Sequence, residues 1–248
     1  MDILSPNMLL PFGGILVVVA FLYASVGHGG ASGYLALMAL FSFPMLVLKP
    51  TALLLNMFVS AISFWFFYKN NHFNWKLFYP FAITSIPMAF LGGYISIDAT
   101  LYKQILGVFL AFAIIRMLTV IGKDKQELRK SNLFGSLIIG SAIGLFSGMI
   151  GIGGGIILSP VIVLLDWGTM KQAAAVSALF IFVNSMSGII GFTVKGGEVP
   201  LETWYFIPLA ILGGSFGALY GSQKFKNNTL KHLLAGVLIL ATIKLFLV

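Results

Sequence analysis

The chain has 248 residues, of which 59% are hydrophobic and 9% are charged, and its mean hydropathy is +1.01. Soluble domains are much less apolar, so this composition predicts an integral membrane protein. A net charge of +8 would suggest nucleic-acid binding in a soluble chain. Here the basic residues lie mostly in short stretches between apolar segments, where they set orientation in the membrane, and no nucleic-acid partner is expected. The lack of cysteine excludes disulfides, thiolate metal sites and cysteine nucleophiles.

The apolar residues form long runs that predict an all-α protein with about five hydrophobic segments in each half of the chain. A spanning helix needs about 20 apolar residues, and fewer where it is broken. In chain order, we expect segments at residues 8–26, 33–48, 51–68, 77–97, 104–121, 132–150, 155–165, 172–194, 203–221 and 232–248. The chain then divides into a first membrane repeat (1–121), a basic linker (122–131) and a second membrane repeat (132–248).

Two motifs occur once in each half. The glycine-rich stretch VGHGGASGYLAL surrounds Gly27, and IGIGGGIILSPV surrounds Gly151; IPMAFLGG ends at Gly93, and IPLAILGG ends at Gly214. Repeats with interrupted hydrophobic segments at matching positions are typical of secondary transporters. Each glycine-rich stretch predicts a broken or re-entrant helix, and the residues alone do not decide whether the first two segments of each repeat cross the membrane fully.

Loop charges predict that the two repeats are inverted. The linker GKDKQELRK is basic, as are the loops around Lys69–Lys76 and Lys224–Lys231, and we place all three in the cytoplasm. The loop that contains Lys195 also contains Glu198 and Glu202, and it falls on the other side. This alternation requires an odd number of membrane crossings per repeat, and it places both termini outside the cytoplasm. We expect the protein in the inner (plasma) membrane of the cell.

The candidate substrate-binding residues lie at the two glycine-rich breaks and in the segments that follow them. Glycine lets the backbone approach a ligand closely, and a helix that restarts after a break points free N–H groups at an anion. His28 is the histidine that lies within an apolar segment, where it is a candidate for anion binding or for titration with a coupled proton. The expected site comprises Gly27, His28, Gly29, Gly30, Ser32, Asn56, Gly151, Gly153, Gly154, Gly155 and Asn184.

Each candidate also has a structural explanation. The glycines could serve helix packing, and His28, Asn56 and Asn184 could bond between helices. Lys49 and Lys171 occupy matching positions that we assign to loops, where they could attract anions or simply be solvated. No catalytic residue, metal ligand or cofactor is expected. A coupled proton and a homo-oligomer are compatible with the sequence, which decides neither.

The stretch GLFSGMIGIGGGIILSPVIVLL, its partial copy in the first half and the LGG motif of each half resemble the TauE/SafE family of sulfite exporters. The first copy departs from the GxGGG pattern and reads GHGGA. The resemblance implies a multi-pass transporter of sulfite, organosulfonates or related sulfur and carboxylate anions. The leading hypothesis is therefore a secondary transporter that moves small anions by alternating access, and not an enzyme. The alternatives are an anion channel and, less favoured, a membrane-embedded hydrolase that uses Ser147.

Overall fold

The computed structural model describes residues 6–95 and 128–226, with single positions at 101, 104, 108, 229, 232, 236 and 239. Within these residues the chain is helical and has no strand. Its helices are α1 (Pro6–Ser25), α2 (Ala31–Leu40), α3 (Met45–Lys69), α4 (Trp75–Tyr94), α6 (Leu133–Ile150), α7 (Gly155–Leu164), α8 (Met170–Val194) and α9 (Thr203–Gln223). In the described residues, six of these helices are long and apolar enough to cross a membrane. The expected all-α membrane fold is confirmed; the segments at 104–121 and 232–248 lie outside the described residues apart from single positions.

The two short helices, α2 and α7, are too short to cross a membrane by themselves. Each has 10 residues, or about 15 Å, which is half the thickness of the hydrocarbon core. The end of α2 returns to the end of the molecule where α1 starts, because Phe12 of α1 packs against Phe41 with ring centroids 5.3 Å apart. Likewise, Trp167 after α7 lies near Gly135 at the start of α6. Both therefore have the geometry expected of re-entrant half-helices.

The boundary expected for the second segment, 33–48, is wrong. The short helix α2 stops at Leu40, and α3 begins at Met45 after Pro44. Ser42, between them, has a φ of 58°, so the chain turns here rather than continuing as one helix. Consequently Lys49 lies in α3, not in a loop, and Lys171 lies in the first turn of α8.

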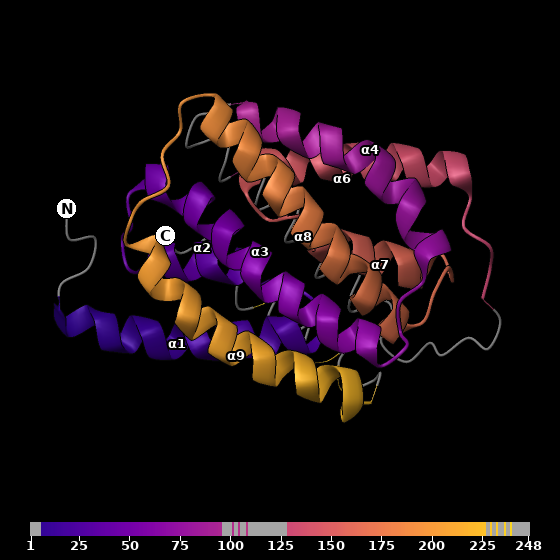
Figure 1. Cartoon of the computed structure of the whole chain (residues 1–248), viewed down its shortest axis with the longest axis horizontal. Helices are drawn as coiled ribbons and strands as arrows, with labels where there is room; N and C mark the ends of the chain where they lie inside the picture. Colours follow the sequence, from indigo (N-terminus) through magenta and orange to yellow (C-terminus); the bar gives the residue numbers. More distant parts are fainter. Residues whose placement is uncertain are drawn as a thin grey trace.

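The long helices form three layers, with α3 and α8 between the α1–α9 pair and the α4–α6 pair (Figure 1). Glycines let the outer pairs approach closely. In α9, Gly213, Gly217 and Gly221 lie directly against the backbone carbonyls of α1, and in α6, Gly140, Gly144 and Gly148 lie against the backbone of α4. Small residues spaced four apart are typical of close helix packing in membranes. Each of these two pairs is parallel, because the contacts advance in the same direction along both helices.

The halves of the chain contain corresponding helices that run in opposite directions. The lengths are 20, 10, 25 and 20 residues for α1 to α4 and 18, 10, 25 and 21 residues for α6 to α9. The end of α9 lies beside the start of α4, and α1 runs parallel to α9, so α1 also ends where α4 starts. Since α6 runs parallel to α4, α1 and α6 start at opposite ends of the molecule (Figure 1). The inverted repeat and its domain boundaries remain predictions, although this arrangement is the one that they require.

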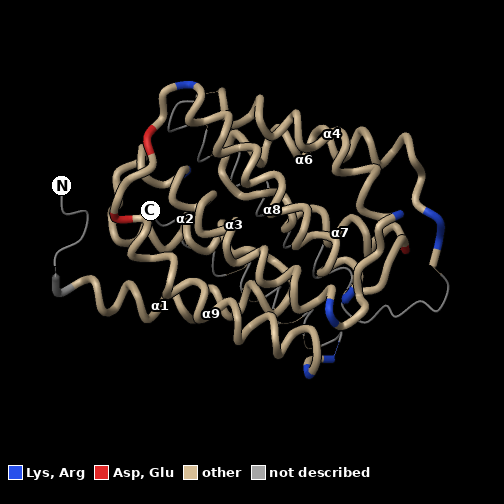
Figure 2. The backbone as a smooth tube through the Cα atoms, in the orientation of Figure 1, with Lys and Arg blue, Asp and Glu red and all other residues tan. Residues whose placement is uncertain are grey.

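Basic loops gather at one end of the described structure (Figure 2). At this end, Ser222 O accepts hydrogen bonds from His72 Nε2 and Lys171 Nζ, each at 3.2 Å, and the backbone N–H of Arg129 donates to Asp166 O. The loop between α8 and α9, which contains Lys195, Glu198 and Glu202, lies at the opposite end (Figures 1 and 2). The charge asymmetry read from the sequence therefore coincides with the two ends of the helical bundle.

Candidate functional site

The two breaks are built from glycines in left-handed conformations. Gly30 (φ 101°) and Gly154 (φ 79°) are the N-caps of α2 and α7. Residues with side chains adopt this region at a cost, and glycine does not. In the first turn of each half-helix, the N–H groups of residues 32–33 and 155–156 have no partner within the helix. The positive ends of two half-helices are thus formed inside the protein.

Asn56, in the middle of α3, connects the two breaks. Its Oδ1 accepts a hydrogen bond from the N–H of Ala31 at 3.2 Å, at the start of α2. Its Nδ2 donates to Ile152 O at 3.2 Å, in the second break, and to Ser185 Oγ of α8 at 3.1 Å. The side chain is 1% exposed. A single buried amide therefore joins α3, α8 and both breaks.

Two glycines make the position of Asn56 possible. A Cβ added to Gly29 would overlap the Asn56 amide and lie 2.6 Å from its Cγ, and a Cβ at Gly153 would overlap Nδ2 from the other side. The φ of Gly29 is not positive, so close packing alone requires glycine there. Gly29 and Gly153 therefore enclose the amide between the breaks.

His28 links the first break to the second half-helix. Its Nε2 lies 2.9 Å from Ser159 Oγ of α7, and the backbone of Gly155 also lies beside the ring. Ser159 Oγ donates to Ser177 Oγ of α8 at 2.7 Å. The Nδ1 atom of His28 is buried without a hydrogen-bond partner among the described residues. We call His28, Gly29, Asn56, Gly153 and Ser159 the central junction.

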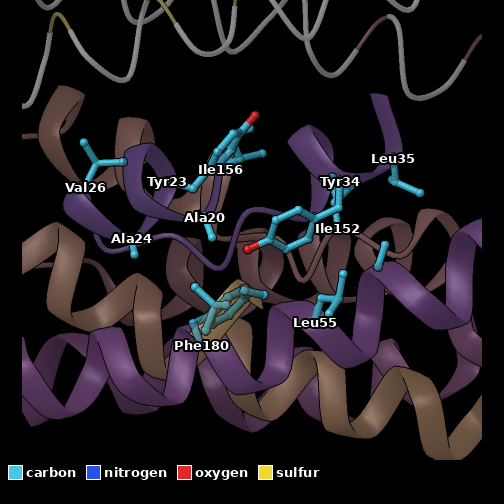
Figure 3. Packing of buried hydrophobic residues seen from close by; sticks show 14 of the residues in the cluster. Ala20, Tyr23, Ala24, Val26, Tyr34, Leu35, Leu55, Ile152, Ile156 and Phe180 are labelled. Carbon is cyan, nitrogen blue, oxygen red and sulfur yellow. The ribbon is translucent and has the colours of Figure 1, made fainter. Parts of the chain in front are cut away.

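Tyr34 places a second polar atom without a hydrogen-bond partner at the start of α2. Its hydroxyl would lie 2.5 Å from a Cβ at Gly30, and it is buried with no partner in the described residues. In Figure 3 the hydroxyl points away from α2 into the middle of the labelled residues. The start of α2 therefore offers a hydroxyl without a partner among the described residues, beside the first-turn N–H groups.

A family model described as "Sulfite exporter TauE/SafE" matches residues 12–245. The chain belongs to the TauE/SafE family. This TauE/SafE protein is 39% identical over 239 residues to the probable membrane transporter protein y4hK of Sinorhizobium fredii, covering 92% of this chain and 94% of that protein. It is 27% identical to the probable membrane transporter protein MJ0441 of Methanocaldococcus jannaschii, covering 76% and 74% of the two chains. No solved structure matches it significantly.

These matches confirm the resemblance found in the sequence. The family and the relatives named above are membrane transporters, so this TauE/SafE protein is a multi-pass membrane transporter of the cell membrane and not an enzyme. Ser147, the residue considered for a hydrolase, donates its hydroxyl to Gly144 O of its own helix at 3.1 Å. As a membrane transporter, the protein would act on a small solute within the lipid bilayer.

Not all the expected site residues meet at the central junction. Ser32 Oγ lies 2.7 Å from the hydroxyl of Tyr23, on the α1 side. Asn184 Nδ2 donates to Phe180 O of its own helix at 2.8 Å, and its Oδ1 has no partner among the described residues. Three glycines of the breaks pack elsewhere: Gly27 on Ala174, Gly151 on Lys49, and Gly154 on Ile143 and Phe180.

Sequence reasoning missed three polar residues around the junction: Ser177, Ser185 and Tyr34. The two serines carry no clear signal in the sequence, because serines in membrane helices commonly bond to their own backbone. Ser159 is also absent from the site expected from the sequence. Only the packing of α7 and α8 against the breaks brings these hydroxyls to His28 and Asn56.

Proposed function

We propose that this TauE/SafE protein is a secondary transporter of small oxyanions that works by alternating access. Its two halves act as inverted repeats around a site at the central junction. The observation that carries the proposal is the convergence of both half-helix starts on Asn56 and His28. Sites between the broken helices of inverted repeats are the common arrangement in secondary transporters.

The chemistry of the junction favours an anion. The starts of α2 and α7 supply N–H groups and the positive ends of helix dipoles, and Tyr34 supplies a hydroxyl donor. Within the described residues, the acidic side chains Asp166, Glu198 and Glu202 lie outside the helices. A cation at this position would therefore meet positive helix ends without a carboxylate to balance it.

The hydrogen bonds of His28 support coupling to a proton. Ser159 uses its hydrogen to donate to Ser177, so it accepts from His28 Nε2–H. The other nitrogen, Nδ1, then carries a lone pair and has no partner in the described residues. A lone pair repels an anion, whereas a protonated Nδ1 donates to it. We infer that the proton binds Nδ1 when the anion binds, and leaves with it.

Burial of the junction supports a carrier rather than an open pore. His28 and Asn56 are each 1% exposed, and Ser159 is 3% exposed. A solute reaches these atoms only if helices move. Alternating access supplies this movement when one half moves relative to the other.

Transport by purified protein in proteoliposomes tests this proposal. Radiolabelled sulfite and sulfoacetate are added outside, under inert gas for sulfite, and uptake is followed over time. We expect saturable uptake that unlabelled anion inside the vesicles accelerates. Uptake that rises linearly with concentration and shows no such exchange would indicate a channel. A protein that moves none of sulfite, sulfate, thiosulfate, sulfoacetate and simple carboxylates would contradict the proposal altogether.

A further inference from the structure

We propose that Lys49 forms a second anion-binding site, which admits the oxyanion at the end of the protein where α4 ends. This inference depends on the proposed function for its ligand class, a small oxyanion such as sulfite, a sulfonate or a carboxylate. The site differs from the central junction, because Lys49 Nζ binds carbonyl groups at the end of α4 and not His28 or Asn56.

The ammonium group of Lys49 lies at the end of α4. Nζ donates to Gly93 O at 3.0 Å and Gly92 O at 3.3 Å, with Ile95 O at 3.5 Å. It also lies 5.7 Å from the ring centroid of Phe192 in α8. The last carbonyls of a helix carry a partial negative charge, so they stabilise a cation only partly.

Among the described residues, the hydrogen-bond partners of the Lys49 ammonium group are neutral carbonyl groups. It is partly buried, and no carboxylate of the described residues lies within ion-pair distance of it. The charge of Lys195, a second cation, acts unfavourably on it. Removing a cation from water is costly unless it is paired. An oxyanion would supply the missing charge and would bind more strongly than the carbonyl oxygens that it displaces.

The side chain of Lys49 also leads toward the second break. A Cβ added to Gly151 would lie 3.2 Å from Lys49 O and 3.3 Å from its Cγ. Gly151 is the residue at which α6 ends, just before Gly153 of the central junction. Lys49 therefore extends from the beginning of the second break to the end of α4.

The opposite end of the molecule has a similar arrangement. Lys171, at the start of α8, donates to Ser222 O in the last turn of α9 at 3.2 Å. Each lysine comes from the start of a long middle helix and binds the end of the fourth helix in its own half. A movement of α4 would release Lys49, and a movement of α9 would release Lys171. The two lysines would thus bind anion alternately at the two ends.

Equilibrium binding of radiolabelled sulfite to the purified full-length protein tests this site. Lys49→Gln keeps a hydrogen-bond donor for the α4 carbonyls but removes the charge, and we expect it to weaken binding by roughly tenfold or more because a charge-assisted bond is lost. Lys49→Arg keeps the charge and should bind within about threefold of the wild type. Lys76→Gln, at an exposed lysine near the start of α4, is the matched control and should bind like the wild type.

The outcomes separate this site from the central one. Loss of binding in Asn56→Ala with full binding in Lys49→Gln would overturn the Lys49 site and leave the proposed function standing. Loss in Lys49→Gln with binding kept in Asn56→Ala would support Lys49 and count against the central junction. A wild type that binds no anion would overturn both.

Chemical labelling of the wild type provides a second measurement if Lys49→Gln does not fold. An uncharged amine-acylating reagent is applied with and without sulfite, and peptide mass spectrometry follows each lysine. We expect sulfite to slow the acylation of Lys49 with the concentration dependence of binding and to leave Lys76 unaffected. Equal acylation of Lys49 at all sulfite concentrations would contradict the site.

Discussion

His28 Nε2 and Ser159 Oγ lie 2.9 Å apart, although 131 positions separate them in the sequence. This contact connects the loop before one half-helix with the first turns of the other. Because the two residues belong to different halves of the chain, a movement of one half relative to the other would change their distance. The bond therefore reports directly on the relative position of the halves.

Replacing His28 should separate anion transport from proton movement. His28→Gln keeps a donor for Ser159 but has no group that takes up a proton near neutral pH, so we expect its sulfoacetate uptake to lose its dependence on pH between about 5 and 8. A pH-sensitive dye inside the vesicles should then show no proton uptake with the anion. Proton uptake that remains coupled in His28→Gln would contradict the role of His28.

The control for this experiment is His72→Gln. His72 lies at the basic end, where burial lowers its pKa from 6.5, partly offset by the hydrogen bond to Ser222 O. Neutral His72 is thus favoured in the folded protein near pH 7. Its replacement removes a histidine without touching the central junction, so coupled proton uptake should be retained.

The two buried asparagines should behave differently. Asn56→Ala leaves the Ala31 N–H and Ile152 O without their partner, and an unsatisfied buried group costs about 1–3 kcal/mol. We expect Asn56→Ala to lower the thermal stability in detergent and to reduce uptake by at least roughly tenfold. Asn184→Ala removes a bond within its own helix only, so its stability should change less. Equal effects on stability and uptake would argue against the bridging role of Asn56.

Gly29 tests the close packing around the junction. In Gly29→Ala, the new methyl group would overlap the amide of Asn56 and break the bond to Ala31. Overpacking of this kind typically costs about 1–3 kcal/mol. Gly14→Ala is the control, since Gly14 lies in α1 with no atom within 4 Å of an added Cβ, and helical alanine is favoured over glycine. Thermal unfolding should show a loss for Gly29→Ala and no loss for Gly14→Ala.

The sequence predicted the helices well because apolar runs and glycine-rich breaks are local signals. It placed α7 at 155–165, and the structure has Gly155–Leu164. The prediction for 33–48 was wrong because the apolar run continues through the turn around Ser42. Lys49 and Pro50 were assigned to a loop because a charged residue followed by proline is typical of loops, whereas both lie in α3. Pro50 lies inside α3, in its second turn, where it cannot donate the usual backbone hydrogen bond to the carbonyl of Leu46.

The candidate site was predictable only in part. The glycines and His28 could be recognised because an ionisable residue is unusual within an apolar run, and the glycine cluster recurs in the second half of the chain. The partners of His28 and Asn56 could not, since they depend on the register of α7 and α8 against the breaks. Asn184 resembles Asn56 in the sequence, but its amide donates within α8 and does not reach the junction. Only the packed structure distinguishes the two residues.

The orientation of the protein can be measured with single cysteines, because the chain has none of its own. Lys130 lies at the basic end, next to Arg129, and Glu198 follows α8 at the other end. The positive-inside rule predicts that Glu198→Cys reacts with a membrane-impermeant maleimide in intact cells, and that Lys130→Cys reacts only after permeabilisation. The reverse result would invert the orientation but leave the fold intact. Labelling of both positions from one side would contradict the placement of Lys130 and Glu198 at opposite ends of the bundle. It would also contradict the inverted repeat on which alternating access depends.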